Sequence, residues 1–111
     1  MAMTDTYASQ EPDRSHIDST QGPLVLEFGA PWCGYCKAAQ PLIAKAFASH
    51  EDVPHIKIED GKGRPLGRSF RVKLWPSLIF IRDGREVSRL VRPDDAEAIR
   101  KELAQLVSAG A

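Results

Sequence analysis

Short apolar runs and longer segments with helical spacing alternate along this chain. Residues 24–28 form an apolar run of strand length, and residues 53–59 alternate apolar with polar side chains as a second strand would. Two further strand-like runs, 77–82 and 86–91, flank Asp83-Gly84, a dipeptide that favours a tight hairpin turn. We therefore expect these two runs to be antiparallel neighbours in a sheet.

Helical periodicity fills the gaps between these runs. From Gly34 onward apolar residues recur at helical spacing, and Pro41 is expected to kink that helix. Pro65 predicts a short helix that begins at the proline. Near the end of the chain, Asp94 is the predicted N-cap of a helix, with Glu97 three residues later in capping-box position. The apolar stripe of this last helix comprises Ile99, Leu103, Leu106 and Val107.

The order of these elements predicts an α/β fold in one domain. A parallel strand pair joined by a helix, followed by a hairpin and a covering helix, gives a mixed sheet with helices on both faces. A chain of 111 residues suits a single core. Residues 1–21 are polar, with Tyr7 and Ile17 as the only bulky apolar side chains besides the methionines. We therefore expect a flexible arm there, with one helical turn at residues 14–18, ahead of a folded domain at residues 22–111.

Composition limits the classes of partner. Fifteen Lys and Arg balance fifteen Asp and Glu, so no net basic field attracts nucleic acid or an anionic membrane. No stretch approaches the roughly 18 apolar residues of a membrane span, and the polar start has no apolar signal-peptide region. We expect a monomeric cytoplasmic protein with neither nucleic acid nor membrane among its partners.

The two cysteines are the candidate reactive groups. Cys33 and Cys36 lie where the first strand leads into the first long helix, and a disulfide between them would close too small a loop to stabilise the fold. Unpaired N–H groups and the helix dipole stabilise a thiolate at the start of a helix, and Lys37 adds a nearby positive charge. Cys33 is the expected attacking thiol, and the more shielded Cys36 the resolving one.

The Cys-x2-Cys spacing alone is equally compatible with a metal site. Together with His50 and His55, Cys33 and Cys36 satisfy a zinc-finger spacing. However, a helix rises about 1.5 Å per residue, so Cys36 and His50 at its two ends would lie about 20 Å apart, whereas zinc holds each ligand at about 2.0–2.3 Å. We therefore predict no metal, and expect His16, His50 and His55 to be solvated surface residues.

Several segments resemble the thioredoxin family. The sequence Phe-Gly-Ala-Pro-Trp-Cys-Gly-Tyr-Cys-Lys at residues 28–37 is similar to the family's active-site segment, and Pro41 falls at its helix-kinking proline. Trp75-Pro76-Ser77 resembles the cis-proline loop, and Asp83-Gly84 the hairpin turn. The resemblance covers residues 22–107 and implies the thioredoxin fold, a redox-active Cys33–Cys36 disulfide without other cofactors, and a cis Pro76 packed against the dithiol.

The resemblance also assigns residues around the cysteines. Glu27 interrupts an apolar strand, and from the residues alone it is either an edge position in water or a buried, paired acid. The resemblance implies the buried acid beneath the active site, with Lys57 facing it, and a role in relaying a proton for Cys36 through water. The implied substrate-facing residues are Trp32, Gly34, Tyr35, Trp75, Pro76 and Arg92.

Some features depart from the family pattern. Residues 1–21 contain no counterpart of the family's first strand, so we expect a sheet of about four strands. Tyr35 replaces the usual proline between the cysteines, as in the Cys-Gly-Tyr-Cys centres of periplasmic disulfide isomerases, Trp75 is bulkier than usual, and Arg92 falls where glycine is common. We expect an enzyme that reduces protein disulfides and is itself reduced by a reductase or thiol pool. The alternatives are a disulfide isomerase and a binding module that uses the cis-proline groove without turnover.

Overall fold

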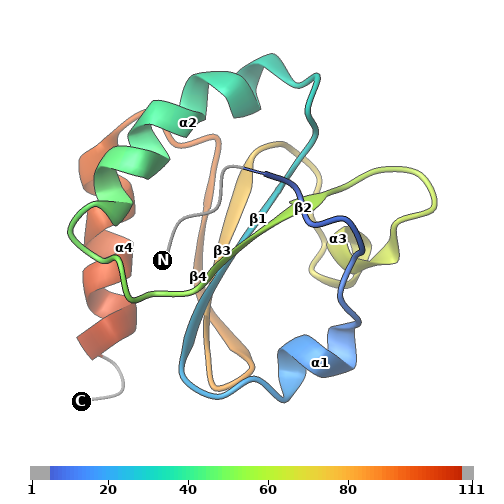
Figure 1. Ribbon diagram of the computed structural model, residues 1–111, viewed down its shortest axis with the longest axis horizontal. Helices are drawn as coiled ribbons and strands as arrows, with labels where there is room; N and C mark the ends of the chain where they lie inside the picture. Colours follow the sequence, from blue (N-terminus) through green and yellow to red (C-terminus); the bar gives the residue numbers. More distant parts are fainter. Residues whose placement is uncertain (1–5, 109–111) are drawn as a thin grey trace.

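Three layers make up the fold of residues 6–108, which the structure describes. In this computed structural model, a four-stranded sheet of order β2-β1-β3-β4 lies between two layers of helices (Figure 1). Strands β1 and β2 are parallel, and the other two pairs are antiparallel. The elements in chain order are α1 (Arg14–Asp18), β1 (Pro23–Gly29), α2 (Gly34–Phe47), β2 (His55–Glu59), α3 (Pro65–Ser69), β3 (Ser77–Arg82), β4 (Arg85–Val91) and α4 (Ala96–Ser108).

The observed elements confirm the predicted fold class and the mixed sheet with helices on both faces. Asp83 and Gly84 have φ of 51° and 79°, the left-handed conformation that both centre positions of a type I′ hairpin turn require. Two details of the last helix were wrong. Asp95, not Asp94, precedes α4 and accepts a hydrogen bond from the Glu97 N–H at 3.0 Å, and Val107 is exposed, outside the buried stripe.

The alternation of side chains along β1 divides the core in two. Val25 and Glu27 face the layer of α2 and α4, whereas Leu24, Leu26 and Phe28 face the layer of α1 and α3. Each layer has its own apolar cluster, because a strand with neighbours on both sides must bury both faces. Glu27 is therefore the one charged side chain that β1 directs beneath α2. The alternative prediction, that Glu27 lies at the edge of the sheet with its side chain in water, was wrong.

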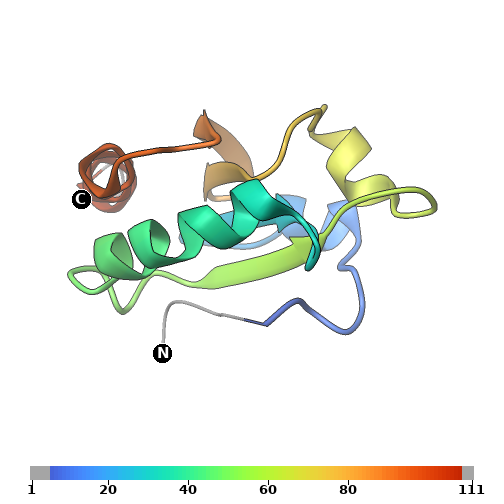
Figure 2. The same ribbon diagram turned by 90° about the horizontal axis from the view of Figure 1, so that it is seen from above.

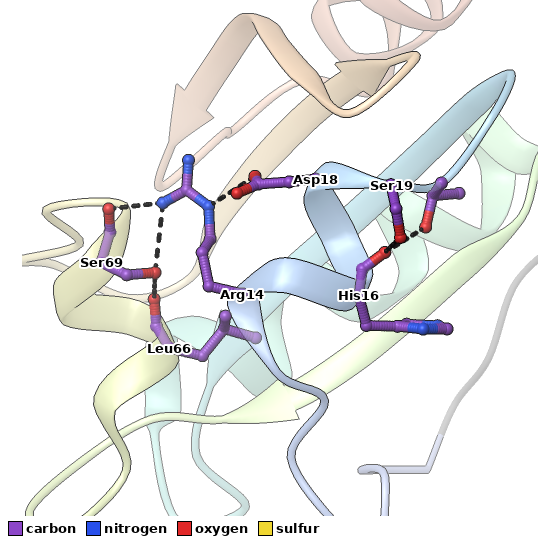
Figure 3. A network of polar contacts seen from close by, with 7 residues as sticks. Arg14, His16, Asp18, Ser19, Leu66 and Ser69 are labelled. Carbon is purple, nitrogen blue, oxygen red and sulfur yellow. Dashed lines mark hydrogen bonds and ion pairs between the residues drawn. The ribbon is translucent and has the colours of Figure 1, made fainter.

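The segment before β1 packs against the domain. Its predicted helical turn is α1, where the Ile17 side chain is fully buried in the cluster on that face. The Arg14 guanidinium donates to Asp18 Oδ1 at 2.9 Å and to the Ser69 carbonyl at 2.6 Å, which ties α1 to α3 (Figure 3). The same guanidinium lies 3.8 Å from the centre of the Phe70 ring. Residues 14–18 thus have tertiary contacts that the polar composition did not predict.

Residues 6–9 run along the outer edge of β2 (Figure 2). The Ala8 N–H donates to the Lys57 carbonyl at 2.8 Å, which occupies one hydrogen-bonding position of this edge strand. Residues 1–5, the remainder of the predicted arm, lie outside the described part of the chain. The contact brings Tyr7 alongside the strand that carries His55 and Lys57.

We predict that Ile17→Ala lowers the free energy of unfolding by about 3 kcal/mol, because it removes a fully buried side chain from the core and leaves a cavity. Urea denaturation measures this loss. His16→Ala, on the exposed face of the same short helix, is the matched control and should leave the midpoint nearly unchanged. Equal midpoints for both variants and the unsubstituted protein would mean that α1 contributes nothing to the folded state.

Candidate active site

Cys33 is the N-cap of α2. Its backbone is extended, with φ −78° and ψ 118°, and its sulfur accepts a hydrogen bond from the Cys36 N–H at 3.2 Å. A Ser or Asp oxygen usually fills this position, because the first N–H groups of a helix have no partner within the helix. Here a sulfur atom fills it, so the helix start directs a donor and its positive dipole at Cys33. Both cysteines are free thiols.

Cys36 lies behind Cys33 in the first turn, with its side chain buried. Burial raises the pKa of the Cys36 thiol to about 12. The hydrogen bond with Cys33 and the charges of Cys33 and Glu27 act in the same direction, while a hydrogen bond from the Ala30 backbone opposes them. The two sulfurs therefore differ in environment. Cys33 lies at the start of the helix, whereas Cys36 keeps its proton while it remains buried.

Glu27 is fully buried beneath α2 and has partners on both carboxylate oxygens. Oε1 lies 3.0 Å from His55 Nε2, and Oε2 accepts from Gln40 Nε2 at 2.8 Å. Lys57 Nζ lies 3.9 Å from Oε2, so the predicted placement of a lysine facing this acid is found. A buried carboxylate needs such partners, because an unpaired charge in the core costs several kcal/mol.

His55 was predicted to be a solvated surface residue, and this was wrong. Its side chain is fully buried, and its ring lies 5.1 Å from that of Phe47. His55 is two residues before Lys57 on β2, so both side chains point to the same face of the sheet, the face that α2 covers. An ionised carboxylate only accepts hydrogen bonds, so Nε2 carries the hydrogen of this pair whenever Glu27 is ionised.

Gln40 connects the acid to the dithiol, and sequence reasoning missed it. Its amide nitrogen donates to the Cys36 carbonyl at 3.1 Å as well as to Glu27, and its amide oxygen accepts from Lys57 Nζ at 2.8 Å. The signal was its spacing, because residue i+4 from Cys36 lies on the same side of the helix. Gln40 thus bridges the Glu27–Lys57 pair.

The predicted cis peptide bond between Trp75 and Pro76 is present. The Trp75 side chain packs against the cluster of Ala30, Cys33 and Cys36, and its indole N–H donates to Asp60 Oδ2 at 2.9 Å. The exposed Trp32 ring meets Trp75 edge-on, with ring centres 5.3 Å apart. Two tryptophans therefore form an apolar rim beside the sulfurs.

Arg92 connects Trp75 with Tyr35. Its backbone has φ 50°, and its guanidinium Nε donates to the Trp75 carbonyl at 2.8 Å. The guanidinium carbon lies 3.9 Å from the centre of the exposed Tyr35 ring. A shallow groove of about 300 Å³ lies beside this pair, and Gly34 is exposed next to Cys33. Contacts thus join four of the predicted substrate-facing residues beside the dithiol, Trp32, Tyr35, Trp75 and Arg92, whereas Pro76 is buried.

Among residues 6–108, no group of three or more His, Cys, Asp or Glu side chains is arranged to hold a metal ion. Cys36 lies in the first turn of α2, while His50 follows the other end of that helix, as the argument against a zinc finger required. Within the same residues, no helix has the length and apolar character needed to cross a membrane.

We predict that iodoacetamide at pH 8 alkylates Cys33 of the reduced protein and leaves Cys36 unmodified. With a pKa of about 12, only about one Cys36 in ten thousand is a thiolate at that pH. Peptide mass spectrometry measures the label at each site. The same reaction in denaturant should label both cysteines, which controls for intrinsic reactivity. Equal labelling of the folded protein would contradict the assignment of Cys36 as the protonated partner.

Known proteins are similar to this chain in sequence and in structure. Thioredoxin 2 from Pseudomonas aeruginosa PAO1, solved in its reduced form, is 50% identical, with a TM-score of 0.86 over 97% of this chain and 100% of that one. Thioredoxin-2 of Saccharomyces cerevisiae is 33% identical over 105 residues, which are 95% of this chain and 99% of that protein.

Other relatives are matched over only part of their length. The TPR repeat-containing thioredoxin TDX of Arabidopsis thaliana is 33% identical over 78 residues, 70% of this chain but 20% of that protein, and the chain spans 54% and 57% of two further plant thioredoxins. The family model described as Thioredoxin matches residues 6–105, nearly the whole of the described chain. The chain therefore belongs to the thioredoxin family.

Proposed function

We propose that this protein is a thiol–disulfide oxidoreductase that reduces disulfides of other proteins through a Cys33–Cys36 cycle. The observation that carries the proposal is the pairing of a sulfur at a helix N-cap with a buried sulfur three residues later. The first is placed to attack, and the second to complete the exchange. Membership of the thioredoxin family supports the same chemistry.

The first step is attack by the Cys33 thiolate on a substrate disulfide. Its electron pair forms a bond to one substrate sulfur, the substrate S–S bond breaks, and the other substrate sulfur leaves as a thiolate that takes up a proton. The donor from the Cys36 N–H and the dipole of α2 stabilise the attacking anion. The product is a mixed disulfide between Cys33 and the substrate.

The second step requires Cys36 to lose its proton. Once Cys33 is in a mixed disulfide, its negative charge no longer raises the pKa of Cys36, and deprotonation becomes easier. We assign the proton acceptor to Glu27, acting through water, with Lys57 as the charge that faces it. The Cys36 thiolate then attacks Cys33 Sγ, the Cys33–Cys36 bond forms, and the substrate sulfur leaves as a thiolate.

The rim around the sulfurs is the proposed substrate surface. Trp32 and Trp75 offer exposed apolar area for an extended polypeptide, and the backbone at the cis Pro76 lies beside them. Tyr35 and Arg92 form the side of the rim that carries positive charge. Substrate proteins would thus bind through the segment that contains their disulfide.

A reductase or a thiol pool would regenerate the dithiol, and the protein would work as a cytoplasmic monomer that contributes to electron transfer and redox homeostasis. The balanced charge of the whole chain supports the proposal that neither nucleic acids nor membranes are among its partners. Insulin reduction with dithiothreitol tests the activity directly.

We predict that Cys33→Ser abolishes insulin reduction, because it removes the attacking sulfur. Cys36→Ser should also end turnover, but it should accumulate mixed disulfides with substrate, since only the resolving sulfur is missing. Non-reducing electrophoresis and mass spectrometry detect the trapped species. The assignment of roles fails if both variants trap substrate equally.

We predict that Glu27→Gln slows the resolving step at pH 7 by about tenfold, because it removes the proposed proton acceptor and keeps the side-chain size. Single-turnover kinetics of disulfide reduction across a pH series measure the effect. Glu51→Gln, at an exposed position, is the matched control and should change nothing. A pH profile of Glu27→Gln that superimposes on that of the unsubstituted protein would remove Glu27 from the mechanism.

A further inference from the structure

Tyr7 enters the active site from the segment before the first helix. Its half-buried ring lies with its centre 4.7 Å from Lys57 Nζ, and the hydrogen bond from the Ala8 N–H to the Lys57 carbonyl holds the segment in place. The Tyr7 hydroxyl and the Cys36 sulfur are in hydrogen-bonding contact, which helps to raise the pKa of Tyr7 as expected when the hydroxyl is the donor. An aromatic side chain from outside the sheet thus reaches the buried sulfur.

Gly29, at the end of β1, leaves the space in which the hydroxyl and the sulfur meet. A Cβ atom at this position would lie 2.6 Å from Cys36 Sγ and 3.2 Å from the Tyr7 hydroxyl oxygen. The first distance is too short for any side chain, so only glycine allows the two groups to share this side of the strand. Tyr7 therefore occupies a gap in the strand surface that opens onto the resolving sulfur.

The charged and titratable groups around this contact come from every neighbouring element. Cys33 lies at the start of α2, Glu27 projects from β1, Lys57 projects from β2, and His55 acts through its contact with Glu27. Burial, followed by the charges of Cys36 and Glu27, raises the pKa of Tyr7 above its ordinary value of 10.0. Tyr7 accordingly keeps its proton at neutral pH and acts as a donor.

We propose that Tyr7 is a positioning residue for the resolving step, whose hydroxyl stabilises the Cys36 thiolate as it forms. The inference rests on the proposed role of Cys36. When Cys36 gives up its proton to Glu27 through water, Tyr7 keeps its own proton and its hydrogen bond to the sulfur strengthens, since hydrogen bonds to anions are stronger than those to neutral groups. The thiolate then forms the bond to Cys33 Sγ and the substrate sulfur leaves with the electron pair of the broken mixed disulfide.

The probe is dithiobis-nitrobenzoate, a small aromatic disulfide that releases coloured thionitrobenzoate twice. The first release follows attack by Cys33, and the second follows resolution by Cys36. Tyr7→Phe keeps the ring and its contact with Lys57 but removes the hydrogen-bond donor. The proposed role affects only the second release, whereas a disturbed active-site structure would affect both releases. Ser9→Ala removes an exposed hydroxyl from the same segment and is the matched control.

We predict that Tyr7→Phe slows the second release by about threefold at pH 7 and moves its pH profile upward by about one pH unit. Loss of a hydrogen bond to an anion raises the pKa of Cys36, and the more basic thiolate is also more nucleophilic, which offsets part of the loss. The first release, measured with Cys36→Ser alone and in combination with Tyr7→Phe, should be equal. Ser9→Ala should match the unsubstituted protein in both phases.

Two outcomes would overturn this role for Tyr7. One is a second phase whose pH profile is the same with Tyr7→Phe as without it. The other is a profile that Tyr7→Ala moves and Tyr7→Phe does not, because that pattern assigns the effect to the ring alone. If instead Cys36→Ser traps no mixed disulfide, the resolving role of Cys36 itself fails, which is a separate result from either outcome.

Discussion

A carboxylate in the middle of the sheet sets the arrangement of this active site. Glu27 is fully buried on the central strand β1, and burial of an unpaired charge would cost several kcal/mol. Its partners come from α2 through Gln40 and from β2 through His55 and Lys57. The helix that carries the dithiol is therefore held over the sheet by polar contacts as well as by apolar packing, and Gln40 extends these contacts to the backbone of Cys36.

Patterns that repeat along the chain predicted the fold well. The strands, the hairpin at Asp83-Gly84 and the helix that begins at Gly34 depend on local alternation and turn chemistry, which the sequence displays directly. The cysteine pair followed from its place where a strand leads into a helix. The cis peptide bond before Pro76 followed from the family resemblance, because neither local spacing nor composition fixes that isomer.

Side chains whose surroundings come from distant parts of the chain were harder to predict. In the sequence, His55 is one polar residue of an alternating strand, which does not indicate burial. Its side chain is buried because α2 covers the face of β2 to which it points. Tyr7 and Ile17 are isolated large side chains in a polar segment. The average composition of that segment therefore did not predict the contact of Tyr7 with Cys36 or the burial of Ile17 in the core. Asp94 and Asp95 are both chemically suitable caps, and only the structure shows that Asp95 accepts the hydrogen bond from the Glu97 N–H.

Residues 6–9 protect one edge of the sheet against association with other molecules. Strand β2 is an outermost strand of the sheet, and an uncovered outer strand offers a template on which strands of other molecules can add and aggregate. The backbone of Ala8 takes up part of that template. At the opposite border, β4 carries the charged residues Arg85, Glu86 and Arg89, which discourage such addition by solvation and repulsion. The two edge strands of this sheet are thus protected in different ways: β2 by the backbone of residues 6–9, and β4 by charged side chains.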